Sequence, residues 1–277
     1  SLKAGVVPLH TWVPDVYGHA PSAISGLLAG VVSKSMLFLM PVICLRLGMS
    51  RIELGAYLMV FACLNMLVGA IRMLRQPLLR RFLSFSSIGQ TGYLMFGLGI
   101  GLYYSLDQAI AAALFLFLII AVMKSLAFLS AGIYEFYYGT QNVDHLSGIG
   151  LIMKIPGIAT SIALAGLAGI PLLAGFTGKW LIFSAAFAAG DIFAIICLVI
   201  FLISSVISLG GYLPAIVKQY LPTEDSLFSG SLDRNKTRQS KLMLIPIISL
   251  SILVVIIGLF PAPWLNLVTY IVEWIRI

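Results

Sequence analysis

The residues of this chain best suited to chemistry are lysines that lie in or beside apolar sequence. Lys34 and Lys124 occupy the middles of two long apolar segments, Lys179 lies within a third, and Lys3 precedes the stretch GVVPLHTW. A lysine at the centre of a bilayer costs about 2.5–3.5 kcal/mol on insertion scales. Loss of water also disfavours the charged ammonium, so a buried lysine can take up and release a proton. Lysines on successive helices indicate a proton path, whereas scaffold lysines that snorkel to the surface lie near helix ends.

Two stretches with prolines interrupt the helical pattern close to these lysines. The first contains Pro8 and His10, and the second contains Pro171 and Gly175 shortly before Lys179. Broken helices expose backbone groups, which a membrane tolerates only where they line a cavity or a site. We therefore expect a polar interior beside both breaks. Two roles stay open for His10: it can carry protons there, or it can bond to the backbone at a helix end.

The elements that position these residues must be membrane helices. Charged residues make up 10% of the 277 residues and apolar residues 60%, with a mean hydropathy of +1.06. Soluble domains carry about 25% charged residues, so the composition excludes a soluble enzyme, a disordered chain and a nucleic-acid-binding domain. Apolar runs of 18 or more residues favour helices over a β-barrel. The sequence predicts an all-α integral membrane protein that crosses the bilayer several times.

Apolar runs of about 20 residues mark the individual spans. The segment 155–189 is too long for one straight span and too short for two, so we interpret it as one broken helix. Residues 264–277 form a short amphipathic tail suited to the membrane interface. The chain should therefore have seven to eight spans, one or two of them broken. They are a partial span at 2–13 and complete spans at 22–45, 52–71, 83–103, 109–138, 155–189, 192–217 and 242–260.

The loop charges set the orientation of these spans. Most of the loop Lys and Arg residues, among them Arg72, Arg80, Arg81 and Lys218, fall on one side. Basic loops stay in the cytoplasm, which places loops 14–21, 72–82, 139–154 and 218–241 there. The net charge of +7 is then a result of topology, and we expect no nucleic-acid partner.

The sequence predicts no catalytic residue, no metal site and no cofactor. The three cysteines lie inside apolar runs, where they act as small packing residues. No histidines or carboxylates have metal-ligand spacing, and no phosphate-binding loop, dinucleotide fingerprint or nucleophile elbow is present.

Four stretches of this sequence resemble a known family in the same order along the chain. The family is that of the antiporter-like subunits of respiratory complex I, membrane-bound hydrogenases, formate-linked complexes and Mrp-type cation/proton antiporters. The resemblance covers essentially residues 1–215. The four stretches are KAGVVPLHTWVPDVYGHAPSAISGLLAGVVSK (3–34), GAIRMLRQPLLRRFLSFSSIGQTGYLMFGLG (69–99), MKSLAFLSAG (123–132) and GIPLLAGFTGKW (169–180).

The resemblance implies a fold of about fourteen helices with two inverted five-helix repeats. This chain would run from the family's seventh helix to its fourteenth. Residues 1–45 would then be the last two helices of the first repeat, and 52–217 the whole second repeat. Residues 218–241 would form a cytoplasmic loop, and 242–277 the final helix with an interfacial tail.

The resemblance also implies roles for the lysines. Lys3 would match the lysine of the first broken helix, whose glutamate partner lies on an earlier helix outside this chain. Lys34 would match the linking lysine of the next helix, Lys124 the central lysine of the long helix, and Lys179 the group at the second break, towards the outer side. Many members carry a histidine where this chain has Ile120. Without the missing glutamate the first half-channel needs another source for that part.

Together these features predict a proton-translocating or Na⁺/H⁺-antiporting subunit of a respiratory, hydrogenase-type or Mrp-type complex. Its expected location is an energy-transducing membrane, most simply a prokaryotic cell membrane. Its expected partners are other membrane subunits, further antiporter-like subunits among them, together with lipid. Two alternatives stay open: a stand-alone secondary transporter with its own substrate pocket, and a structural subunit that has lost transport. Whether the protein counts as an enzyme depends on its parent complex, since it has no redox site of its own.

Overall fold

Long apolar helices make up this protein, because in a bilayer only a helix satisfies its own backbone groups within one segment. The computed structural model describes residues 1–222 and 239–275, where the regular elements are all helices. Five helical segments in this part are long and apolar enough to cross a membrane. The predicted all-α membrane fold is confirmed. The five segments are Ser22–Arg46, α4 (Arg51–Leu74), α6 (Asp107–Tyr138), α10 (Ile192–Lys218) and α11 (Lys241–Leu259).

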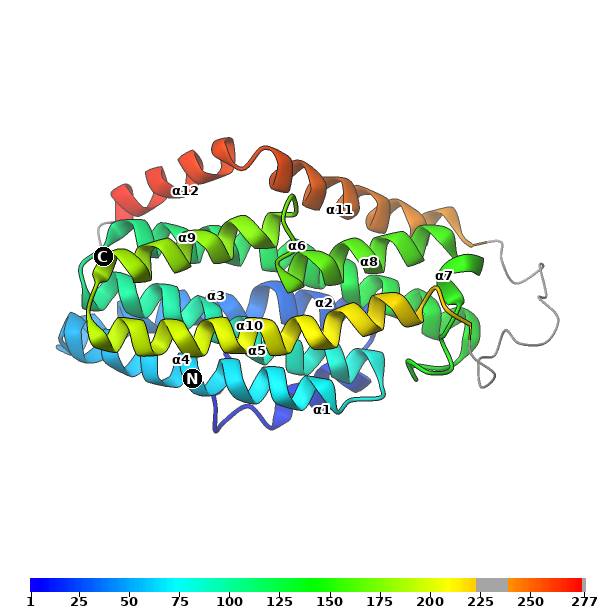
Figure 1. Ribbon diagram of the computed structural model, residues 1–277, viewed down its shortest axis with the longest axis horizontal. Coiled ribbons are helices and arrows are strands. Elements are labelled where there is room, and N and C mark those ends of the chain that lie inside the picture. The colour runs from blue at the N-terminus through cyan, green and yellow to red at the C-terminus, as the bar shows by residue number, and fades with distance from the viewer. Residues whose placement is uncertain (223–238, 276–277) are drawn as a thin grey trace.

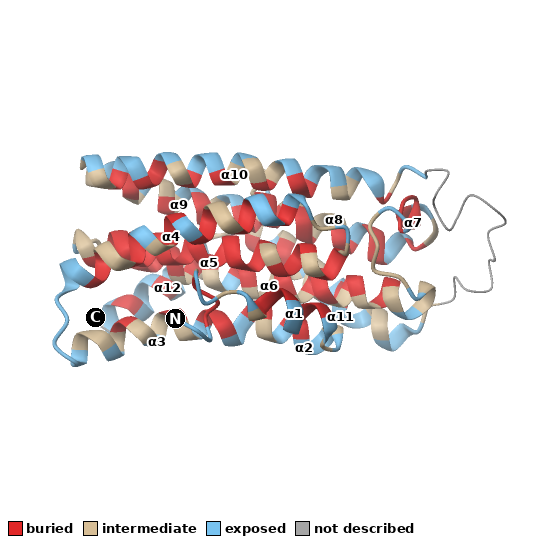
Figure 2. Ribbon diagram, turned by 90° about the horizontal axis from the view of Figure 1, so that it is seen from below, coloured by how far each residue is buried: buried red, intermediate tan, exposed pale blue. Residues whose placement is uncertain are grey.

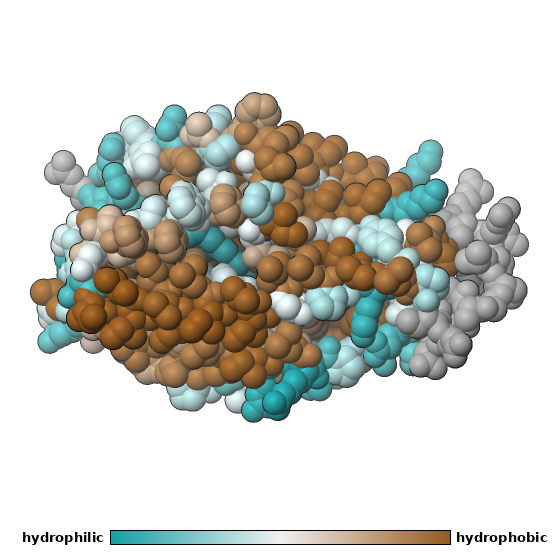
Figure 3. Space-filling model, in the orientation of Figure 1, coloured by the Kyte–Doolittle hydropathy of each residue, from teal (hydrophilic) through white to brown (hydrophobic). Residues whose placement is uncertain are grey.

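The helix α5 (Leu79–Tyr103) lies at the centre of the bundle. Helices α4, α6 and α10 run beside it along the long axis (Figure 1), and nearly every residue of α5 is buried. Figure 2 shows this buried interior as a red band through the middle of the molecule. On the outer side of α10, Ile203 and Val206 are exposed, and hydrophobic residues cover much of the surface there (Figure 3). Such a surface suits lipid.

The predicted broken span is two short helices placed end to end. Helix α8 (Lys154–Ala168) stops before the glycine–proline stretch, and α9 (Ala174–Ala189) starts after it (Figure 1). Between them Leu172 has a positive φ of 74°. The start of α9 approaches α8 so closely that a Cβ on Gly175 would lie 1.8 Å from the Gly166 carbonyl oxygen. Only glycine fits at this point of the break.

The N-terminal part differs from the expected helix at 2–13. Residues 1–11 form turns, and the first helix is α1 (Trp12–His19). The helical prediction was wrong because proline lacks a backbone donor and disfavours helical geometry in the residue before it, here Val7.

The span predicted at 22–45 is also not uniform. Between α2 (Ser22–Leu27) and α3 (Ser33–Arg46) the chain widens into the π-helix η1 (Leu28–Val32). The Tyr17 hydroxyl donates to the Leu28 carbonyl at 3.4 Å and bonds to the Ser33 hydroxyl. A side chain from α1 thus occupies the widened turn, and such turns are frequent at functional sites.

The end of the chain continues along the side of the bundle. Helix α12 (Ala262–Ile275) bends away from α11 and packs against α6 (Figure 1). Its place at a membrane interface stays a prediction. The short helix α7 (Ile149–Ile152) precedes α8, and the predicted loop 218–241 falls largely outside the described residues.

Helices α4 and α5 meet along a seam of glycines. A Cβ on Gly69 would lie 2.3 Å from the backbone nitrogen of Gly89, so the two backbones touch without a side chain between them. Small residues allow this close packing, which replaces the hydrophobic effect as a source of helix association in lipid.

We expect Gly69→Ala to destabilise the protein by about 1–3 kcal/mol, the usual cost of overpacking. Gly210→Ala is the matched control, because a Cβ on Gly210 in α10 meets no atom within 4 Å. That control should be neutral or slightly stabilising, since alanine favours a helix more than glycine does. The measurement is thermal unfolding of the purified protein in detergent. Equal midpoints for the two variants would contradict the tight seam.

Candidate functional site

Lys124 lies in the middle of α6 and is completely buried. Its Nζ donates a hydrogen bond of 2.9 Å to the Leu83 carbonyl oxygen and one of 2.5 Å to the Ser86 hydroxyl, both on α5. A helix carbonyl has two lone pairs, so Leu83 can accept from Lys124 besides its own helical partner. Helix α5 therefore supplies the acceptors that make a buried ammonium tolerable.

Lys179 lies in the first turns of α9, and the break before α9 supplies its partners. Its Nζ donates to the Leu167 carbonyl oxygen at 3.0 Å and to the Ala168 carbonyl oxygen at 3.2 Å. These carbonyls close the C-terminal end of α8, where carbonyls lack helical partners and the helix dipole favours a cation. The ammonium also lies 4.6 Å from the centre of the Tyr93 ring, within range of a cation–π contact.

Lys34 lies in the first turn of α3, directly after η1, and is 1% exposed. Lys124 is a second buried cation of the same bundle. Because like charges repel inside a protein, we expect the protonation of one of these lysines to affect that of the other.

A stripe of polar side chains runs along α5 past these lysines. Ser86, Gln90 and Tyr93 are spaced four and three residues apart, which places them on one face of the helix. The Ser86 hydroxyl bonds to the hydroxyl of Tyr212 on α10, which also interacts with the Gln90 side chain. All four residues are buried.

This stripe connects the two hydrogen-bonded lysines. Lys124 donates to Ser86 at one end. At the other end Gln90 Nε2 donates to the Leu167 carbonyl oxygen at 3.1 Å, the same oxygen that accepts from Lys179. The structure thus brings Lys124 and Lys179 into one continuous polar line through an apolar bundle.

Sequence reasoning missed the polar stripe. Its signal is the run SFSSIGQTGY (84–93), which carries several hydroxyl and amide groups in a spanning helix. Polar side chains in such a helix need internal partners, so this density could have marked α5 as the inner wall of a path.

The other predicted site residues lie apart from this line. Lys3 is exposed and Pro8 lies in the N-terminal turns, while Pro171 lies in the break between α8 and α9. His10 is partly buried and lines a separate cavity of about 370 Å³ with Arg72 and Arg81. Among the described residues, no group of three or more His, Cys, Asp or Glu residues could hold a metal ion.

One charge assigned to a loop belongs to the interior instead. Arg80 lies in the first turn of α5, is 3% exposed and forms an ion pair of 2.7 Å with Glu135 of α6. Its assignment to a loop was wrong, because counting basic residues for topology takes no account of burial.

Comparison with known proteins identifies the family. The transmembrane family described as NADH:quinone oxidoreductase/Mrp antiporter matches residues 1–208. NADH-quinone oxidoreductase subunit N of Geotalea uraniireducens (strain Rf4) is 30% identical over 273 residues, which cover 99% of this chain and 55% of that protein.

Solved structures show the same fold. A chain of the Mrp complex from Dietzia sp. DQ12-45-1b has a TM-score of 0.82 at 21% identity, covering 97% of this chain and 56% of that one. A chain of respiratory complex I from Thermus thermophilus has a TM-score of 0.73 at 25% identity, covering 96% and 56%. The chain spans about half the length of these relatives. From the family match over most of its length, the chain belongs to the NADH:quinone oxidoreductase/Mrp antiporter transmembrane family.

Proposed function

We propose that this chain moves protons through the membrane as one subunit of a multisubunit complex. The polar line from Lys124 through the α5 stripe to Lys179 is the observation that carries the proposal. Three buried cations cost several kcal/mol each to place in an apolar bundle. A purely structural subunit would not need these buried lysines.

The chemistry of the line suits proton transfer. An ammonium at Lys124 donates to Ser86, whose hydroxyl pairs with Tyr212. Hydroxyl groups both accept and donate hydrogen bonds, so this pair can pass a proton on with the help of internal water. A charge arriving at Lys34 repels the charge on Lys124, which drives the proton towards Lys179.

The path favours protons over sodium ions. The charged groups that line it are ammonium groups, which repel a metal cation but exchange protons directly. The energy for transport would come from neighbouring subunits, as the relatives' names of quinone oxidoreductase and Mrp complex suggest. This places the chain in an energy-transducing membrane beside other membrane subunits.

Replacing Lys124 or Lys179 by Met should slow proton pumping about 100-fold, at the lower end of what a positioned proton-transfer group contributes. Methionine keeps the length of the side chain but cannot carry a proton. The control is Lys154→Met, because Lys154 is exposed at the start of α8. The measurement is acidification of liposomes that contain the native assembly.

Full pumping with both lysines replaced would support the structural-subunit alternative. Solute transport by the purified chain alone in liposomes would support the stand-alone transporter.

Ser86→Ala should slow pumping about tenfold, because a hydrogen bond to a charged group contributes roughly 1.5–3 kcal/mol. Ser87→Ala is the matched control on the next residue of α5, since the buried Ser87 hydroxyl has no hydrogen-bond partner within the described residues. Pumping rates of the two variants in the same liposome assay make the comparison. If both variants pump equally, the stripe does not belong to the path.

Replacing all Na⁺ in the liposome assay by K⁺ should leave the proton-pumping rate unchanged, because the ammonium groups on the path repel a metal cation. A rate that rises with Na⁺ concentration would overturn the proton assignment in favour of Na⁺/H⁺ exchange. A proton carrier added to the membrane provides the control, since it should abolish the pH gradient in either buffer.

A further inference from the structure

A cavity large enough for several water molecules lies at the end of the bundle that carries the basic loops. Its volume is about 440 Å³, and α1, the start of α5, the end of α6 and the segment after α6 enclose it. Four of its lining residues are titratable or cationic: His19, Arg81, Glu135 and His145. This cavity lies outside the lysine path, although it reaches α5 and α6, the two helices that hold Lys124.

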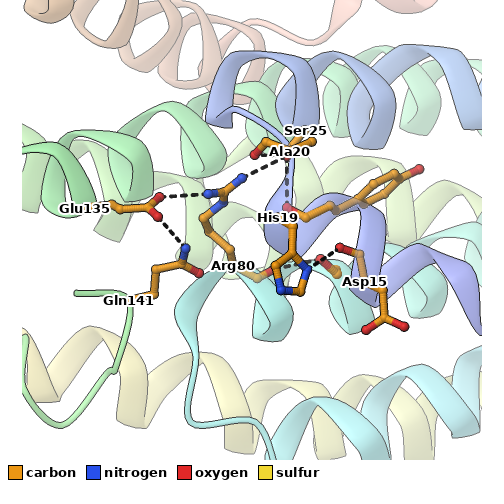
Figure 4. A network of polar contacts seen from close by, with 9 residues as sticks. Asp15, His19, Ala20, Ser25, Arg80, Glu135 and Gln141 are labelled. Carbon is orange, nitrogen blue, oxygen red and sulfur yellow. Dashed lines mark hydrogen bonds and ion pairs between the residues drawn. The ribbon is translucent and has the colours of Figure 1, made fainter. Parts of the chain in front are cut away.

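The Arg80–Glu135 ion pair lies at the edge of this cavity, between water and the interior of the bundle. The Glu135 side chain is 36% exposed, whereas the Arg80 side chain is 4% exposed. Arg80 Nη1 donates to Glu135 Oε2 at 2.7 Å, and Gln141 Nε2 donates to Oε1 at 2.6 Å (Figure 4). The other end of the guanidinium donates to the Ser25 hydroxyl at 3.3 Å. The carboxylate therefore meets water while its cation stays inside.

The same seam between α5 and α6 holds the ion pair and Lys124. Lys124, Phe128 and Glu135 lie on one stripe of α6, and Glu135 lies about 16 Å further along the helix axis. On α5, Leu83 accepts from Lys124 and follows Arg80 by three residues, about 4.5 Å along the axis. The Arg80–Glu135 pair is thus the end of the Lys124 seam that lies nearest to water.

We propose that Glu135 loads protons from the cavity into the lysine path and that Arg80 transmits this loading to Lys124. The inference rests on the proposed function and adds the group that takes up the proton. In the loading step, hydronium transfers its proton to the Glu135 carboxylate, which gives a neutral carboxylic acid and water. Arg80 then loses its counter-charge, and its uncompensated positive charge repels the ammonium of Lys124.

Unloading restores the starting state. The repulsion favours transfer of the Lys124 proton onward to the Ser86 side, which leaves a neutral amine on Lys124. The proton on Glu135 then passes to that amine, and Glu135 returns to the carboxylate that pairs with Arg80. One proton enters and one leaves in each cycle, so the charge of the seam is unchanged.

The groups around Glu135 suit a proton-collecting site. Arg80 and Arg81 face it from α5, His19 from α1, and His145 from the segment after α6. His19 Nδ1 bonds to the Asp15 carbonyl oxygen at 2.8 Å, which leaves Nε2 to accept a proton. Two histidines beside a carboxylate offer ring nitrogens that can pass protons between bulk water and the acid.

The competing explanation is that the ion pair only ties α5 to α6. The variant Glu135→Gln in the native assembly distinguishes the loading role from the structural role. Glutamine keeps the size of the side chain and a hydrogen-bonding oxygen but cannot take up a proton. We expect pumping to fall at least about tenfold, while Glu135→Asp keeps most of the rate. Asp144→Asn is the control, since Asp144 is an exposed acid near the same end that pairs with Lys218. An unchanged rate in Glu135→Gln would overturn the inference.

A double variant removes the remaining ambiguity. Glu135→Gln with Arg80→Gln leaves no unpaired buried charge, so a purely structural role predicts that the double variant regains the pumping rate. A loading role predicts that it stays at least about tenfold slow. Infrared difference spectra during turnover give a second readout: the carbonyl band of a protonated carboxylic acid should appear and should vanish in Glu135→Gln.

Lys124→Met separates this inference from the proposed function. A slow Lys124→Met variant beside a normal Glu135→Gln variant rejects only the loading role. Normal pumping in both variants rejects the proton path itself.

Discussion

The structure depends on one constraint: a positive charge in the core of an apolar bundle must find acceptors without water. Two lysines meet it in different ways. Lys179 uses carbonyls that the broken helix leaves free at the end of α8, and Lys124 uses a helical carbonyl together with a hydroxyl of α5. The break between α8 and α9 is therefore part of the site, because an intact helix would have bonded those carbonyls to its own next turn.

The central helix α5 has a different composition on each of its faces. Towards α4 it carries glycines that let two backbones touch, as at Gly89. Towards α6 and α10 it carries the hydroxyl and amide groups that reach Lys124 and Tyr212. Its first turn carries Arg80, whose charge Glu135 balances at the water-facing end. A buried helix tolerates such polar groups because most of them meet a hydrogen-bond partner, on a neighbouring helix or within α5 itself.

Residue type and spacing predicted the features that a single helix determines. They missed the contacts that depend on how two helices pack together. Most of the long spans, the break around Pro171 and the central places of Lys124 and Lys34 follow from apolar length and from proline and glycine. The partners of Lys179 could not be predicted, because they depend on how the end of α8 meets α9. Arg80 was misplaced for a similar reason, since its burial follows from packing against α6. Residues 1–11 form turns because Pro8 disfavours a helix there. The helix expected at 2–13 rested on apolar length alone.

The proposed lysine path depends on a moderate coupling between its charges. Two like charges 10 Å apart at an effective dielectric of 20 repel by about 1.7 kcal/mol, which changes an equilibrium by more than tenfold. In the proposed path, a coupling of this order lets a charge on Lys34 shift the proton on Lys124 without trapping it. A carboxylate placed directly beside Lys124 would instead hold the ammonium in a fixed pair. The acid of this seam, Glu135, lies at its water-facing end and pairs with Arg80 rather than with Lys124.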